Sequence, residues 1–139
     1  MKDQNDLSKK PDSSTDGSAK KLPHDHGQQT HIQQLQDHMP EDREFSHIAN
    51  IYKQIDDEKR LKIFWLLCHV EECVINIAAM MDMSSPAVSH HLARLKASGL
   101  IVSSRKGKEV YYKAADTKEV RLLHDMIEEL VDITCPTSR

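Results

Sequence analysis

Apolar residues are distributed unevenly along the 139-residue chain, and this distribution limits where a hydrophobic core can form. Residues 1–40 contain seven apolar residues, whereas residues 41–139 contain 46. The first segment cannot bury enough apolar surface to offset the entropy lost on ordering, so we expect a disordered, His-containing N-terminal tail. Residues 41–135 are predicted to form one domain of ordinary size, followed by a short C-terminal tail at residues 136–139.

Composition and the start of the chain exclude several protein classes. No apolar run approaches the roughly 18–20 residues that span a bilayer, so no membrane association is expected. The start, MKDQNDLSKKPDSS, lacks the apolar block of a secretory signal. Three Cys at irregular spacing argue against a disulfide framework and for a reducing compartment. We therefore expect a cytoplasmic protein.

Three- and four-residue spacing of apolar side chains predicts most of the domain to be helical. Helices are expected over 45–55, from a cap at Asp56-Asp57 to about His69, and over about 74–81, with a break at 70–73. A last helix is expected from Asp116 or Thr117 to near Thr134. One side of this helix is expected to carry Val120, Leu123, Ile127, Leu130 and Val131.

A helix-turn-helix followed by a hairpin is predicted in the middle of the domain. Ser84 or Ser85 is a good N-cap, and Pro86 suits the first turn of a helix that runs to about Ala97. Gly99 is expected to end this helix in a left-handed conformation. Strands at 100–103 and 109–113 then flank a turn at 105–108. The predicted fold is mainly α with a small β-hairpin wing, a winged helix-turn-helix.

This element order and the local charge favour DNA binding. The formal charge is +4 over residues 81–113 but −3 over both 41–80 and 114–139. A recognition helix presents its N-terminal residues to base edges in the major groove, while a basic wing contacts phosphate. His90 and His91 are expected either to face DNA or to pack beneath it. The expected DNA-binding residues are Ser84, Ser85, Ser89, His90, His91, Arg94, Lys96, Arg105, Lys106 and Lys108.

Four segments of the domain carry a resemblance to a known family. They are IDDEKRLKI from residue 55, ECVINIA from residue 72, MSSPAVSHHL from residue 83 and GKEVYY from residue 107. With these segments the chain resembles the ArsR/SmtB family of metal-responsive repressors over about residues 45–133. The resemblance implies a homodimer joined by its first and last helices, double-stranded operator DNA as the partner, and release from DNA when a metal ion or another inducer binds.

The resemblance also implies two places for an inducer. At the family's interfacial zinc site Asp116 matches a usual ligand, but Lys118 stands in place of a His, and an ammonium cannot bind a cation. At the site near the start of the third helix, Cys73 takes the central Cys position, and imidazoles from the tail could complete the ligand set. The expected cofactor is an ion of the Zn, Cd, Pb, Co or Cu class. The candidate metal ligands are Cys73, Cys135, His24, His26 and His31.

The cysteines leave alternatives open. Cys73 is either a ligand or a small buried apolar residue, since free Cys is often buried. Cys73 and Cys135 either share a soft metal ion, with His69 or His124 nearby, or form a redox pair. Cys68 lies on the predicted buried helix and is expected in the core.

The leading hypothesis is a sequence-specific repressor that a thiophilic or transition metal ion releases from its operator. The alternatives are a thiol-redox-responsive repressor of the same fold and a winged-helix protein-interaction module without metal sensing. An enzyme is not expected. No Ser/His/Asp or Cys/His set accompanies a nucleophile turn, and the four Gly form no phosphate-binding loop.

Overall fold

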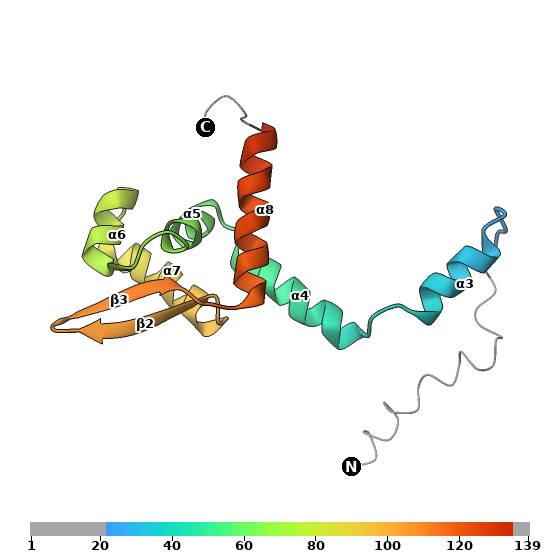
Figure 1. Cartoon of the computed structure of the whole chain (residues 1–139), viewed down its shortest axis with the longest axis horizontal. Helices are drawn as coiled ribbons and strands as arrows, with labels where there is room; N and C mark the ends of the chain where they lie inside the picture. The colour runs from blue at the N-terminus through green and yellow to red at the C-terminus, as the bar shows by residue number, and fades with distance from the viewer. Residues whose placement is uncertain (1–21, 135–139) are drawn as a thin grey trace, which may run out of the picture. The chain divides into compact units, whose positions relative to one another are not determined.

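The computed structural model describes residues 22–134, and the chain divides into two units, Met1–Phe45 and Ser46–Arg139. The second unit has the predicted winged helix-turn-helix fold, with helices and a small antiparallel sheet (Figure 1). In chain order the elements are α3 (Gln29–Asp37), α4 (Asp42–Gln54), α5 (Glu58–Leu67), β1 (Glu72–Cys73), α6 (Val74–Met81), α7 (Ser85–Ala97), β2 (Ile101–Lys106), β3 (Glu109–Ala114) and α8 (Lys118–Thr134).

Local side-chain chemistry sets the ends of α5 and α7, as predicted. The Asp57 carboxylate accepts a hydrogen bond from the backbone N–H of Arg60 at 2.9 Å, and this bond lowers the pKa of Asp57. The Ser84 hydroxyl accepts one from the backbone N–H of Ala87 at 3.2 Å. Gly99, with φ at +83°, follows the end of α7. These capping bonds satisfy backbone groups that a helix end leaves without an intrahelical partner.

The core of the second unit is formed by the apolar sides of α5, α6 and α7, together with Ile101 of β2 and two residues of α8. Ile51 and Ile55, at the end of α4 and just beyond it, are partly buried against this core. Cys68 also packs against it, but is half-buried rather than central. The buried residues are Ile63, Phe64, Leu67, Ile77, Ala78, Val88, Leu92, Leu95, Leu100, Ile101, Ala115, Val120 and Leu123.

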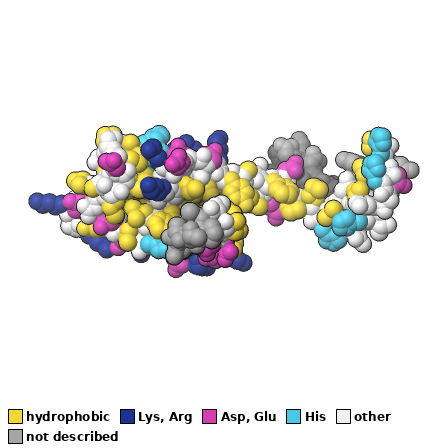
Figure 2. Space-filling view, turned by 90° about the horizontal axis from the view of Figure 1, so that it is seen from above, with side chains coloured by type: hydrophobic (Ala, Val, Ile, Leu, Met, Phe, Trp, Pro, Cys, Tyr) yellow, Lys and Arg dark blue, Asp and Glu magenta, His cyan; other side chains and the backbone are white. Residues whose placement is uncertain are grey.

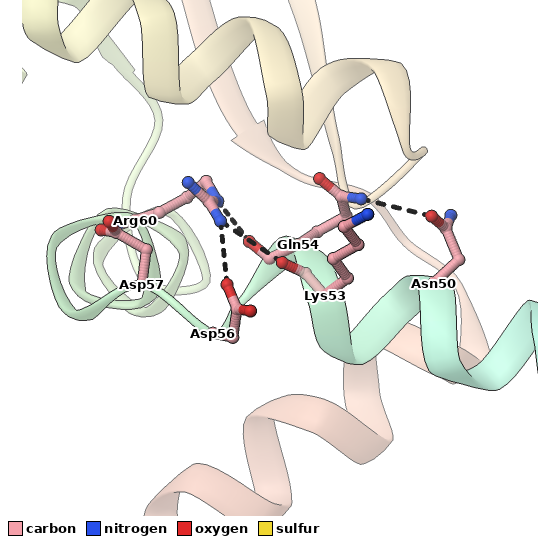
Figure 3. Close-up of polar contacts among 6 residues, drawn as sticks. All are labelled: Asn50, Lys53, Gln54, Asp56, Asp57 and Arg60. Carbon is pink, nitrogen blue, oxygen red and sulfur yellow. Dashed lines mark hydrogen bonds and ion pairs between the residues drawn. The ribbon is translucent and has the colours of Figure 1, made fainter.

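Arg60 fastens the end of α4 to the start of α5 (Figure 3). It is 3% exposed and is the only charged residue buried in the described part of the chain. Its Nε donates to the carbonyl oxygen of Gln54, and its Nη2 lies 3.3 Å from both the carbonyl oxygen of Lys53 and Oδ1 of Asp56. The last carbonyls of a helix have no intrahelical donor, so this guanidinium supplies one.

The sheet contains a strand that the sequence did not predict. Segment 70–73, expected only to interrupt the helices, includes β1, which pairs antiparallel with β3 in the order β1-β3-β2. Glu72 lies opposite Tyr112, and Cys73 lies opposite Tyr111. A two-residue strand has too few positions to show the alternating pattern by which strands are predicted.

The hairpin turn is shorter than predicted. The prediction of a four-residue turn at 105–108 was wrong. Arg105 and Lys106 continue β2 and lie opposite Val110 and Glu109. Only Gly107 and Lys108 connect the strands. A two-residue hairpin turn needs a positive φ, which Gly107 supplies at +67°. The wing is therefore a longer and more regular ribbon than expected.

The first unit contains a helix within the segment that we expected to be disordered. Helix α3 buries none of its residues. Its hydrogen bonds include Gln33 Nε2 to Asp37 Oδ1 at 3.0 Å, and the ring of His38 contacts the carbonyl oxygen of Gln34 at 2.9 Å. Such i, i+4 contacts stabilise a helix locally. Residues 1–21 of the expected tail lie outside the described residues.

Helix α8 is apolar on two sides. Val120 and Leu123, on the predicted apolar side, are buried, whereas Leu130 is half exposed. Leu130 belongs to an outer stripe of large apolar residues with exposed fractions from 38% to 70%. This stripe consists of Leu122, Met126, Leu130 and Ile133. Across residues 22–134 no helix has the length and apolarity needed to cross a membrane.

We predict that Arg60→Ala lowers the free energy of unfolding by about 1–3 kcal/mol, because it removes the donor to the part-buried carbonyl oxygens of Lys53 and Gln54. Urea denaturation followed by circular dichroism measures this change. Lys59→Ala, at the exposed neighbouring position, is the matched control and should stay within about 0.5 kcal/mol of the parent. Equal stability of the two variants would show that the Arg60 contacts contribute nothing.

Candidate nucleic-acid interface

The turn between α6 and α7 determines where α7 begins. Asp82 ends α6 with φ at +58°, a left-handed conformation that Asp tolerates better than most residues. The backbone N–H of Met83 donates to the carbonyl oxygen of Ala78 at 3.0 Å and closes the end of α6. Ser84 then caps α7, which leaves Ser84 and Ser85 exposed at its N-terminus.

Helix α7 buries one side and exposes polar groups along the rest. Val88, Leu92 and Leu95 are at most 1% exposed. Ser89 and His90 are exposed, as is Lys96 in the last turn. Because the apolar side is locked into the core, the exposed hydroxyl and imidazole groups have a fixed orientation relative to the rest of the unit.

Two predicted DNA-binding residues of α7, His91 and Arg94, are half-buried. Nδ1 of His91 is buried and has no hydrogen-bond partner in the described part of the chain. Burial lowers the pKa of His91, the positive charges of Arg60 and Arg94 add to this shift, and Asp57 opposes it. His91 therefore lies near the start of α5, which favours a position beneath the interface over contact with DNA.

Glu71 holds the wing to the segment before β1. Its Oε1 lies 2.7 Å from Nζ of Lys106, and its Oε2 accepts a hydrogen bond from Oγ of Ser104 at 3.4 Å. Nζ of Lys106 also lies 5.2 Å from the centre of the Tyr111 ring. The hydrogen bond between Lys106 and Glu71 lowers the pKa of Glu71 and raises the pKa of Lys106. This role of Glu71 could not be predicted from local sequence, since its partner is 35 residues away.

The end of the wing carries exposed positive charge. Figure 2 shows Lys and Arg side chains protruding where the β2–β3 hairpin of Figure 1 ends. Arg105 and Lys108 are exposed and make no ion pair among residues 22–134, whereas Lys106 is paired with Glu71. Arg105 and Lys106 are successive strand residues, so their side chains leave opposite faces of the ribbon. Arg105 and Lys108 are thus the wing cations best placed to meet phosphate.

The predicted metal ligands are not gathered in one place within either unit. Cys73 is 7% exposed, and it belongs to no group of three potential ligands among the described residues. His24, His26 and His31 belong to the first unit, where the rings of His24 and His26 stack with their centres 5.9 Å apart. Cys135 lies outside the described residues.

Asp116, considered for an inducer, and Cys68, expected in the core, have different surroundings. Asp116, the residue that matched the interfacial zinc site, forms an ion pair with Arg121 at 2.8 Å. Burial, with the nearby charge of Glu128, raises the pKa of Cys68 to about 11. Cys68 is therefore a thiol at neutral pH and a weak nucleophile.

Comparison with known proteins identifies relatives of this fold. The model of "bacterial regulatory protein, arsR family" matches residues 57–103. The chain is 40% identical over 77 residues to the cadmium resistance transcriptional regulatory protein CadC of Listeria innocua. This match covers 55% of this chain and 65% of CadC, just under two thirds of the length of CadC. It is 31% identical over 103 residues to the transcriptional repressor SmtB homolog of Synechocystis, covering 72% of this chain and 78% of that protein.

A solved structure agrees with these matches. Reduced HlyU from Vibrio cholerae has a TM-score of 0.58 to this chain at 28% sequence identity, and the match covers 67% of this chain and 94% of HlyU.

We predict that the free energy of unfolding falls as the pH decreases below the ordinary His pKa of 6.5, in part because of His91. Its pKa is lowered by folding, so over this range the unfolded chain binds a proton that the folded chain does not. His91→Gln should reduce the difference in unfolding free energy between about pH 7.5 and about pH 5.5, measured by urea denaturation. His90→Gln, at the exposed preceding position, is the control. A parent-like pH dependence in His91→Gln would contradict this assignment.

Proposed function

Because the chain belongs to the arsR family of bacterial regulatory proteins, we propose that it is a sequence-specific repressor that binds operator DNA as a homodimer and is released by a metal ion. The observation that carries the proposal is the pairing of a core-anchored helix, α7, whose N-terminal polar groups are exposed, with a wing that ends in unpaired cations. Operator binding would place the protein in the cytoplasm.

The N-terminal half of α7 has the chemistry of a recognition helix. The hydroxyls of Ser85 and Ser89 can donate to and accept from base edges or phosphates, and His90 adds a second kind of donor. The partial positive charge of a helix N-terminus also favours a phosphate nearby. Val88 and Leu92 keep this half of the helix fixed, so DNA would meet a preformed surface.

The wing would hold the protein to the DNA backbone beside the groove. Arg105 and Lys108 supply charge for phosphate contacts, which set position rather than read sequence. Glu71 already compensates Lys106, so we assign Lys106 mainly to the position of the ribbon. This division of labour places the electrostatic part of binding on the two unpaired wing cations.

The outer stripe of α8 supports the homodimer. Leu122, Met126, Leu130 and Ile133 would be unfavourably exposed on a monomer, and they recur along one helix at spacings of three and four residues. A second copy of α8 can bury the same stripe, as a two-fold interface requires. This agrees with the last helix as an interface element, which the family resemblance implies.

For the inducer we propose a metal ion of the Zn, Cd, Pb, Co or Cu class, with Cys73 as one ligand. The support is the ligand chemistry of a thiolate and the cadmium resistance in the name of the relative CadC. Cys73 is nearly buried, so binding there would require the N-terminal end of α6 to open. The roles of Cys135, His24, His26 and His31 stay predictions from the sequence.

We expect the protein to select a defined DNA sequence from a random duplex library. Fluorescence anisotropy with the selected duplex should then show an affinity that decreases as the salt concentration rises. Cd²⁺ or Zn²⁺ should decrease this affinity further. A duplex of equal length and scrambled sequence is the control. Equal affinity for both duplexes would contradict the repressor and favour a protein-interaction module. A complex insensitive to metal but dissolved by an oxidant would favour the thiol-redox repressor.

Removing both unpaired wing cations tests the interface itself. Arg105→Ala/Lys108→Ala should weaken operator binding by at least about tenfold and reduce the slope of log affinity against log salt by roughly 0.9 for each lost phosphate contact. Lys62→Ala/Lys118→Ala removes the same charge from exposed positions on α5 and α8 and is the matched control. Equal losses in both variants would show that only net charge matters.

Replacing apolar residues of the outer α8 stripe tests the dimer. We expect Leu122→Asp/Leu130→Asp to be monomeric in analytical ultracentrifugation, because two carboxylates cannot be buried against their own copies. Glu129→Gln, at an exposed position of the same helix, should stay dimeric. An unchanged dimer in the double variant would place the interface elsewhere.

A further inference from the structure

Two imidazoles and one carboxylate converge between the end of α5 and α8. His69 follows the C-cap of α5, and His124 and Glu128 lie one turn apart on α8. Nε2 of His69 and Nε2 of His124 are 3.1 Å apart. Oε2 of Glu128 lies 3.3 Å from Nε2 of His124 and 3.6 Å from Nε2 of His69. Three potential ligand atoms from distant parts of the sequence therefore surround one point.

These separations match those of a tetrahedral metal site. Zn²⁺ binds His nitrogen and carboxylate oxygen at about 2.0–2.1 Å, so the ligand atoms of a tetrahedral site lie about 3.3–3.4 Å from one another. The three observed distances lie on both sides of this value. A small adjustment of side chains would place each atom at bonding distance from a shared ion.

Hydrogen bonds alone satisfy the cluster poorly. A neutral imidazole carries one N–H, so Nε2 of one ring can donate to the other ring only if the second presents a lone pair there. The accepting Nε2 of the second ring then carries no hydrogen that it could donate to Glu128. If both Nε2 atoms carry hydrogens and donate to Glu128, two N–H groups face each other across 3.1 Å. A divalent cation accepts a lone pair from all three atoms at once.

The neighbouring side chains hold the carboxylate and one ring in place. Nε1 of Trp65 donates to Oε2 of Glu128 at 2.7 Å. The rings of Trp65 and His69 pack with their centres 4.5 Å apart. Metal ligands in proteins are typically oriented by such outer hydrogen bonds. The three side chains remain between 24% and 42% exposed, so an ion can reach them from solvent.

We propose that His69, His124 and Glu128 form a binding site for a first-row divalent cation of the Zn²⁺ type, with a fourth position open to water. Two imidazoles with one carboxylate suit Zn²⁺ and Co²⁺ better than the softest thiophilic ions. This site is separate from Cys73 and uses none of the groups assigned to DNA.

An ion at this site would join the end of α5 to α8. Because α8 carries the proposed dimer stripe, the ion would favour one arrangement of α8 against the rest of the unit. Ion binding itself is independent of the proposed repressor function, whereas an effect of this ion on operator affinity rests on that function. The test of the site is therefore made without DNA.

Trp65 is the only Trp of the chain and contacts two of the proposed ligands, so its fluorescence reports on the site. We expect Co²⁺, added to the full chain, to quench this fluorescence with one equivalent per chain and to give the visible absorption of tetrahedral Co²⁺. Zn²⁺ should reverse both signals. His124→Gln and His69→Gln should each weaken Co²⁺ binding by at least about 100-fold, since each removes a direct ligand.

The matched control is His24→Gln/His26→Gln/His31→Gln, which removes three imidazoles of the first unit and should keep the parent quenching of Trp65. Circular dichroism of each variant checks that the fold is retained, and the half-exposed His69 is the safer of the two single substitutions. The proposal is overturned if Co²⁺ does not quench Trp65, if the response survives both single variants in folded protein, or if it disappears in the triple variant.

Discussion

The burial of one side of α7 is the constraint on which the functional surface depends. Val88, Leu92 and Leu95 meet the apolar stripes of α5 and α6 in the core, and this contact leaves the helix no freedom to rotate. Because the apolar side of α7 is held in the core, its polar residues Ser85, Ser89 and His90 face solvent. The turn at Asp82 and the cap at Ser84 place the start of the helix, and thus the end that would enter a groove.

Two polar contacts hold the elements around α7 in place. Arg60 gives donors to the last carbonyls of α4, which joins the helix before the core to the helix that begins it. Glu71 binds Lys106 and Ser104, which joins the segment before β1 to the wing. The second contact has an electrostatic consequence as well, because it compensates one wing cation and leaves Arg105 and Lys108 to act on phosphate.

Local signals in the sequence predict what local chemistry determines. The capping residues Asp57 and Ser84, the left-handed Gly99 and the apolar spacing of α7 all act within a few residues of one another, and the helices they predict are confirmed. Strand β1 escaped prediction because it exists only by pairing with β3.

The tertiary contacts of the sites could be predicted only in part, for the same reason. His124 and Glu128 show a visible i, i+4 spacing on α8, but His69 joins them only after folding, 55 residues away from His124. The pairing of Glu71 with Lys106 and the partial burial of His91 depend in the same way on elements that meet in space. The predicted role of Cys73 rests on family resemblance, and Cys73 belongs to no group of three potential ligands among the described residues.

NMR can show whether α7 and the wing together form the DNA-binding surface. Backbone amide shifts of the labelled protein are followed while a selected operator duplex is added. We expect the largest shift changes at Ser84–Arg94 and at Arg105–Lys108, with small changes along the exposed side of α5. Changes of equal size spread over all surfaces, or changes concentrated on α5 with α7 and the wing unaffected, would contradict it.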